Sequence, residues 1–288
     1  MSLIDDIQNA NEKFNMKNGV GGYQSKVLTT KDIPQTVALY KNIYAILKQH
    51  GCEKFIHPMS KDAIEEIIAS QDQAILGYFK GKQLMGTLYT KPFEQNSPYF
   101  RTPTYDQGKT SYTLGGLAVS PEFRGQGVIT KLSKIIHGGV KSYAENNPEA
   151  GISGIGAEIS CENFSSLSSA KILTDENGKN MLNYVGTHHV PDGKDNDLTV
   201  LGYHSFNHTP TQLDSLPTAT LNGNQQDSLS ALQTLTSNLA SQTSGSTTTN
   251  IDGHEITTLN EYVMAPYADV LKYNKDESPA QENEEPEQ

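Results

Sequence analysis

The chain has 288 residues, and its 33 acidic and 22 basic side chains give a formal net charge of −11. No Lys or Arg occurs between Lys194 and Lys272, and a surface that follows a phosphate backbone needs clustered cations, so we expect no nucleic-acid partner. No apolar run approaches the roughly 20 residues that cross a bilayer, so we expect no membrane partner either.

The cysteine content and the two ends of the sequence bear on the compartment. Cys52 and Cys161 form no C-x-x-C pair, which excludes a disulfide scaffold and fits a reducing compartment. Residues 1–14 lack the basic segment and apolar run of a secretory signal. We therefore expect a cytoplasmic protein. The acidic end is similar in composition to the C-terminal export signals of some bacterial secreted effectors, which gives export as the alternative.

The first part of the chain is expected to be a polar lead-in over residues 1–23 and a short strand over 26–29. A helix is predicted after Asp32 as N-cap, with Gln35 three residues later as in a capping box. Its apolar side chains follow at helical spacing: Val37, Tyr40, Ile43, Tyr44 and Leu47. A second helix is predicted to begin after Ser60 as N-cap.

Alternating strands and helices are predicted next. A hairpin over 74–89 precedes a loop rich in Pro and aromatic residues over 92–107. The strands after the loop are expected over 112–119, 152–159, 181–190 and 198–206. Between the first two of these strands, an apolar stripe that starts at Val128 predicts a helix that ends before Pro148. A short helix is expected to begin near Glu162.

The region after residue 206 differs in composition. Residues 207–273 form a Ser/Thr-rich extension with one or two expected helices, one of them marked by Leu229, Leu232, Leu235 and Leu239. Residues 251–273 are expected to add a small hairpin and helix that dock on the main domain. The last segment, 274–288, holds six acids against Lys275 and is expected to be a disordered acidic tail.

The most informative motif is a strand, a glycine-rich turn and a helix start between Leu117 and Leu132. Such a turn offers several backbone N–H groups to one anion, assisted by the helix dipole, and Arg124 adds a positive charge. A P-loop pattern is absent, and a Rossmann fingerprint would need a third glycine where Thr130 stands. The motif therefore predicts a ligand that carries phosphate.

Arg124-Gly125-Gln126-Gly127-Val128, followed by Leu132, resembles the pyrophosphate-binding motif R-G-x-G-[VI]-[GA]-x-x-L of the GNAT superfamily of N-acetyltransferases. The order of the expected elements over residues 24–206 is similar to that family as well. The resemblance implies an α/β fold with a mixed, mostly antiparallel central sheet flanked by helices. The polar C-terminal extension would be an addition to it.

The resemblance also implies the chemistry. Acetyl-CoA would be the co-substrate, without a metal, and would lie in a V-shaped gap between the strands at 112–119 and 152–159, where Gly115-Gly116 would suit a bulge. An amine of a small molecule or a protein would attack the thioester directly in a ternary complex. The implied cofactor-binding residues are Leu117, Ala118, Val119, Arg124, Gly125, Gln126, Gly127, Val128, Ile129, Asn163 and Ser166. No oligomeric state follows from the sequence.

The candidate catalytic residues are less well marked. Glu158 is the first candidate for the general base that an ammonium requires, with Tyr112 and Glu162 as alternatives. The family often has a Tyr seven residues after the Asn, as acid for the departing thiolate. Here that position is Ala170, so Tyr184, Ser166 or water would protonate the sulfur.

Two features support another possibility, a non-catalytic acyl-CoA-binding or protein-interaction module on the same fold. One is Ala170. The other is Ile129, which stands where the family has Gly or Ala and would either crowd the pyrophosphate or point into the core. No metal site is expected at His188 and His189, because adjacent strand residues point to opposite faces. Cys161 is read as a small buried residue, not a nucleophile.

Overall fold

The computed structural model describes residues 2–18, 21–55, 58–93, 103–175, 178–191 and 198–273. The helices are α1 (Leu3–Asn18), α2 (Ile33–Gln49), α3 (Lys61–Ala69), α4 (Val128–Asn146), α5 (Phe164–Lys171), α6 (Gln225–Ser241) and α7 (Tyr267–Val270). The strands are β1 (Tyr23–Val27), β2 (Ala74–Lys80), β3 (Gln83–Pro92), β4 (Thr110–Val119), β5 (Ile152–Ser160), β6 (Asn183–His189), β7 (Leu198–Ser205), β8 (Ala219–Leu221), β9 (Ser246–Ile251), β10 (His254–Leu259) and β11 (Leu271–Tyr273).

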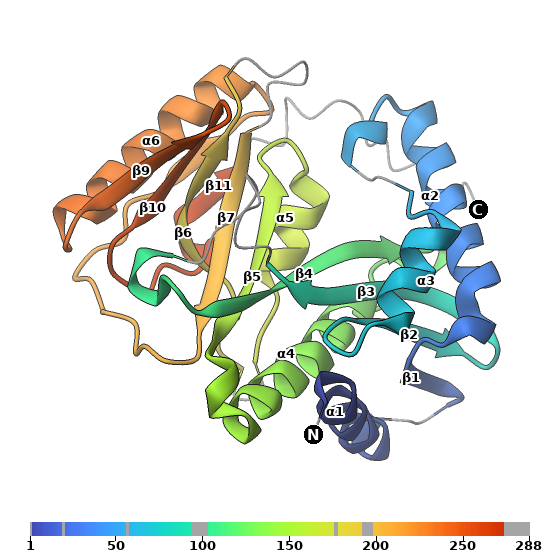
Figure 1. Cartoon of the computed structure of the whole chain (residues 1–288). Helices are drawn as coiled ribbons and strands as arrows, with labels where there is room; N and C mark the ends of the chain where they lie inside the picture. Colours follow the sequence, from blue (N-terminus) through green and yellow to red (C-terminus); the bar gives the residue numbers. More distant parts are fainter. Residues whose placement is uncertain are drawn as a thin grey trace.

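One large sheet organises the described residues. Its nine strands run in the order β1-β2-β3-β4-β5-β7-β6-β10-β9, and every neighbouring pair is antiparallel except β4 and β5, which are parallel. A separate parallel pair joins β8 and β11. The expected α/β architecture is confirmed, with a mixed, mostly antiparallel central sheet and flanking helices (Figure 1).

Helices cover both faces of the first half of the sheet (Figure 1). The sequence of strand β2 is almost continuously apolar because both of its faces are buried. Leu76 and Tyr78 belong to the core cluster that contains the apolar face of α4, whereas Ile75 and Phe79 belong to the cluster formed with α2 and α3. A strand that is buried on both faces needs apolar residues at successive positions.

The two predicted helix caps have different outcomes. Ser60 caps α3 as expected, since its hydroxyl accepts a hydrogen bond from the backbone N–H of Ala63 at 3.1 Å. Asp32 precedes α2, but its carboxylate makes no cap hydrogen bond to that helix. It accepts instead from the Lys26 ammonium on β1 at 2.7 Å, from the Gln35 side-chain amide at 3.0 Å and from the backbone N–H of Thr29, the residue before the 3₁₀ turn, at 3.0 Å.

The expected polar lead-in over residues 1–23 is wrong, because most of it is helix α1 and β1 already begins at Tyr23. Leu3 and Ile7 are fully buried and lie in the main core, and α1 packs along α4. The Asp6 carboxylate accepts hydrogen bonds from Ser142 at 2.7 Å and from Asn146 at 3.0 Å on α4. The core-facing side of α1 is a narrow apolar stripe, and most other residues of the segment are polar, so the sequence pattern did not reveal the helix.

The extension after residue 206 is built into the same sheet. Strand β10 pairs with β6, with Ile256 opposite His188, and β9 follows at the edge. Helix α6 covers this end of the sheet (Figure 1), and its fully buried residues Leu232, Leu235 and Leu239 join the main core. The predicted disordered tail over 274–288 lies outside the described residues. Among the helices that are described, none combines the length and the apolar character that crossing a membrane requires.

Candidate active site

The two central strands separate along their length. Strands β4 and β5 pair from Thr110 opposite Ile152 as far as Thr113 opposite Gly156. Beyond this point β4 continues along β3 to Val119, and β5 continues along β7 to Ser160. Each strand therefore follows its outer neighbour, and a V-shaped gap opens in the middle of the sheet.

A β-bulge lies where β4 turns away, as the glycine pair predicted. Thr87 is opposite Ala118 and Tyr89 is opposite Gly115, so one residue of β3 faces two residues of β4. Gly116 has a φ of 58°, and its carbonyl accepts a hydrogen bond of 2.5 Å from the buried Tyr40 hydroxyl on α2. The bulge is thus fixed by a side chain from the helical layer.

A cavity of about 1050 Å³ occupies the gap. Its walls include Leu114, Gly115, Gly116 and Leu117 from β4 and Ala157, Glu158, Ile159 and Ser160 from β5. The start of α4 adds Ile129, and the α5 region adds Asn163, Ser166 and Ala170. The cavity therefore lies between strand segments that do not pair with each other, and its lining mixes apolar side chains with polar ones such as Ser160, Asn163 and Thr199.

The glycine-rich loop leads into the helix turn that reaches this cavity, because Ile129 lines the cavity and residues 124–127 do not. Arg124, Gly125, Gln126 and Gly127 are exposed and lead directly into α4, a helix of 19 residues. Gly125 and Gly127 have φ values of 75° and 68°. The Lys131 ammonium donates to the Gln126 carbonyl at 3.2 Å, which adds positive charge beside the free N–H groups of the helix start. Ile129 is half-buried and lines the cavity while it packs on the main core.

The remaining predicted cofactor residues divide into two groups. Leu117, Asn163 and Ser166 line the cavity. Asn163 also caps α5, because its side-chain oxygen accepts from the backbone N–H of Ser166 at 3.1 Å. The side chains of Ala118, Val119 and Val128 pack into the two core clusters and do not line the cavity, so these three residues can offer a ligand only their backbone.

Glu158 is the predicted catalytic residue that the structure places in the cavity wall, where its side chain is 16% exposed. Its Oε1 atom accepts from the Thr199 hydroxyl at 2.7 Å and lies 2.5 Å from Nδ1 of His188. Nε2 of His188 in turn lies 2.7 Å from Nδ1 of His254. The carboxylate therefore contacts side chains of β7 and β6, and His254 of β10 contacts the second of these, His188.

The structure places both predicted tyrosines outside the cavity lining. Tyr184 is fully buried, and its hydroxyl lies 2.6 Å from Oγ1 of Thr236 on α6. Tyr112 is buried in the main core. Neither lines the cavity, and burial raises the pKa of both hydroxyls above the usual value. The sequence did not reveal this burial, because alternation alone does not distinguish strand residues that face a core from strand residues that face a cavity.

The other candidates around the gap are structural. Glu162 forms an ion pair with Lys54 and accepts from the Gln225 amide at 3.2 Å. Cys161 is fully buried, and burial, aided by the nearby Glu162 charge, raises the pKa of its thiol to about 12. A thiol with this pKa is a poor nucleophile near neutral pH. Among the described residues, no group of three or more potential ligands could hold a metal ion.

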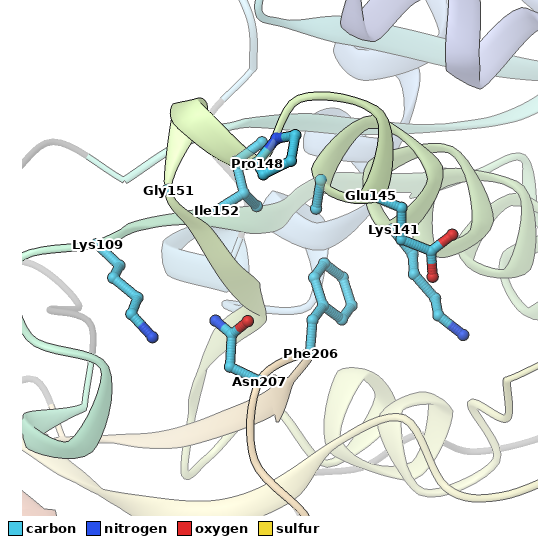
Figure 2. A pocket seen from close by; sticks show the side chains of 9 residues that line it. Lys109, Lys141, Glu145, Pro148, Gly151, Ile152, Phe206 and Asn207 are labelled. Carbon is cyan, nitrogen blue, oxygen red and sulfur yellow. The ribbon is translucent and has the colours of Figure 1, made fainter.

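A second hollow of about 300 Å³ lies at the other end of β5, where that strand still pairs with β4. Figure 2 shows the Phe206 ring between the Asn207 amide on one side and the Lys141 and Glu145 side chains on the other. The hollow contains none of the residues that the sequence motif predicted. The larger cavity is therefore the candidate active site.

Thr199, His188 and His254 are the site residues that the sequence did not reveal. Strand alternation could have put His188 and Thr199 on a common face, because they are directly opposite in the β6–β7 hairpin. His254 could not have been found this way, because the pairing of β10 with β6 joins segments about 65 residues apart in the chain.

Comparisons with known proteins give matches among solved structures. Neither a protein-family model nor a curated protein matches the sequence. The Arabidopsis thaliana NAA60 structure in complex with acetyl-CoA shares 13% identity at a TM-score of 0.46, over 65% of this chain and 99% of that one. Ribosomal-protein-alanine N-acetyltransferase from Brucella melitensis shares 16% sequence identity at a TM-score of 0.42, over 63% of this chain and 99% of that one. An acetyltransferase of the GNAT family from Streptococcus pneumoniae shares 10% sequence identity at a TM-score of 0.42, over 64% of this chain and 99% of that one.

Proposed function

We propose that the chain is an N-acetyltransferase of the GNAT type, which transfers an acetyl group from acetyl-CoA to an amine by direct attack in a ternary complex. The observation that carries this proposal is the gap between β4 and β5. Its cavity of about 1050 Å³ is lined by Ile129 in the first turn of α4, shortly after the glycine-rich loop, and contains a carboxylate in its wall.

The geometry suits each part of acetyl-CoA. Beyond Thr113, β4 has no strand partner on the side of β5, so the amide groups of a pantetheine arm can lie along it as an added strand. The backbone N–H groups from Gly125 to Ile129 then receive the pyrophosphate at the positive end of the α4 dipole, whereas the N–H of Arg124 donates to the Pro121 carbonyl. Room for the phosphates is available, because among the described residues no atom beyond the glycine and its chain neighbours lies within 4 Å of a Cβ placed at Gly125 or Gly127.

Glu158 supplies the base. An acceptor ammonium loses one proton to the carboxylate, and the neutral amine then attacks the thioester carbonyl carbon. When the tetrahedral intermediate collapses, the C–S bond breaks and the nitrogen loses its second proton as the thiolate gains one. Ser166 or water delivers that proton, since Tyr184 is buried away from the cavity. Glu158 finally releases its proton to water.

Coenzyme A binding and acetyl transfer can be tested separately. Saturation with coenzyme A at about 100 times its Kd should raise the Tm by roughly 5–10 °C. Release of free thiol from acetyl-CoA should then follow when a panel of amines and peptide N-termini is added. No shift in Tm would refute the proposal. A shift without thiol release from any amine would indicate the binding module instead.

Replacing the base should separate binding from catalysis. Glu158→Gln should lower kcat by about 10²–10⁴-fold, because the amide cannot take the proton, while the affinity for acetyl-CoA stays the same. The exposed Glu149 lies outside the cavity, so Glu149→Gln is the matched control and should retain full activity. If Glu158→Gln turns over at the normal rate at pH 7, another group is the base.

A further inference from the structure

We propose that His188 and His254 are positioning residues, which hold Glu158 in the orientation that takes a proton from the acceptor amine. The inference rests on the proposed function and extends it. It means that the extension after residue 206 contributes to the active site through His254 on β10, which acts on Glu158 by way of His188.

The arrangement is a diagonal row across four neighbouring strands. Glu158 on β5 is opposite Leu201, so Thr199 is its diagonal neighbour on β7. His188 on β6 is directly opposite Thr199. Ile256 on β10 is opposite His188, so His254 is again the diagonal neighbour. Diagonal positions two residues apart share one face of a sheet, and long side chains reach across them.

The donor and acceptor properties of these groups determine the direction of each hydrogen bond in the row. An ionised carboxylate only accepts, so the 2.5 Å contact places a proton on Nδ1 of His188. Nε2 of a neutral His188 is then an acceptor, and the 2.7 Å contact requires a proton on Nδ1 of His254. Both rings therefore donate toward Glu158. His254 selects the tautomer of His188 that can bind the carboxylate, as an outer hydrogen bond does for other catalytic imidazoles.

Burial restricts the side chains of this row most at His188, next to the Glu158 carboxylate. His188 is 2% exposed, so its ring has a fixed environment, whereas the half-buried His254 sits nearer the surface. Oε1 of Glu158 accepts from both His188 and Thr199, which fixes the plane of the carboxylate. We assign the proton from the amine to Oε2. An N–H bond of the ammonium breaks, an O–H bond forms at Oε2, and His188 keeps its own proton throughout.

The tautomer can be measured without any enzyme assay. In the full chain labelled with ¹⁵N-histidine, long-range ¹H–¹⁵N spectra at neutral pH should show His188 protonated at Nδ1 only. The signals are assigned by their loss in His188→Gln. His254→Phe should remove the single-tautomer pattern, and His189→Gln, on the opposite face of β6, should leave it unchanged. A His188 ring protonated at Nε2, or at both nitrogens, would overturn the inference.

Kinetics provide the second readout. The amide nitrogen of Asn can occupy the place of a histidine Nδ1, whereas that of Gln corresponds to Nε2. His254→Asn should therefore retain most of kcat, and His254→Gln should lower it by about tenfold or more, with the KM for acetyl-CoA unchanged in both. Equal kcat values in these two variants would contradict a positioning role. A wild-type chain that releases no thiol with any amine would instead refute the proposed function.

Discussion

The two glycines of the glycine-rich loop are required by the backbone conformation, and not by crowding from neighbouring residues. Gly125 and Gly127 both adopt positive φ values, and a Cβ atom at either position would meet no other atom within 4 Å. The left-handed conformation costs an L-residue roughly 1–2 kcal/mol, so a side chain here is disfavoured even in an open loop. The open space in front of the loop is what the proposed function assigns to the pyrophosphate.

Gly127→Ala tests this assignment. We expect the free energy of unfolding to fall by about 1–2 kcal/mol because of the positive φ, and the affinity for coenzyme A, measured by titration calorimetry, to fall as well. Gly108 has a φ of 82° and equally open surroundings before the paired end of β4, so Gly108→Ala is the matched control. It should lose similar stability and keep its affinity. Equal affinity in both variants would place the pyrophosphate elsewhere.

At the scale of elements, local signals in the sequence predicted most of the order of strands and helices. The cap at Ser60, the hairpin of β2 and β3 and the helix that starts at Val128 all depend on residues within a few positions of each other. The bulge in β4 was expected from the family resemblance, which Gly115-Gly116 suited, and not from the local pattern alone.

The elements that sequence reasoning missed depend on contacts between distant segments. Helix α1 is stabilised by burial of Leu3 and Ile7 against α4, which follows it by more than 100 residues. The Asp32 carboxylate does not cap α2, because it accepts hydrogen bonds from Lys26 on β1 and from Thr29 before the 3₁₀ turn. Tertiary packing overrides local preference in both cases, and the same holds for His254 in the candidate site.

The bulge of β4 predicts how a side chain at Gly116 would change the stability of the protein. A Cβ atom at Gly116 would overlap the Tyr89 ring and lie 2.7 Å from the Tyr40 hydroxyl. Gly116→Ala should therefore lower the free energy of unfolding in urea by about 2–5 kcal/mol, from strain and overpacking together. Gly81→Ala has nearly the same φ, 59°, without neighbours within 4 Å, and should cost only about 1–2 kcal/mol. Equal losses would mean that the bulge relaxes freely.

At the scale of the whole molecule, the main core joins segments from both ends of the described chain. Its buried residues include Leu3 and Ile7 of α1, Leu132 and Ile136 of α4, and Leu235 of α6. The pairing of β10 with β6 continues the sheet into the extension. The segments before residue 24 and after residue 206 thus share their apolar contacts with the strands that form the gap.

A shared core predicts a single unfolding transition. Ile7 and Leu235 are fully buried, so Ile7→Ala and Leu235→Ala should each lower the free energy of unfolding by about 2–5 kcal/mol. Far-UV circular dichroism and tyrosine fluorescence should report the same midpoint in urea for each variant, because the two ends unfold together with the sheet. The 80% exposed Met16 provides the control, since Met16→Ala should change stability by less than about 0.5 kcal/mol. Two separate transitions, with only one of them moved by Leu235→Ala, would show that the extension folds independently and would remove the basis for a role of β10 in the active site.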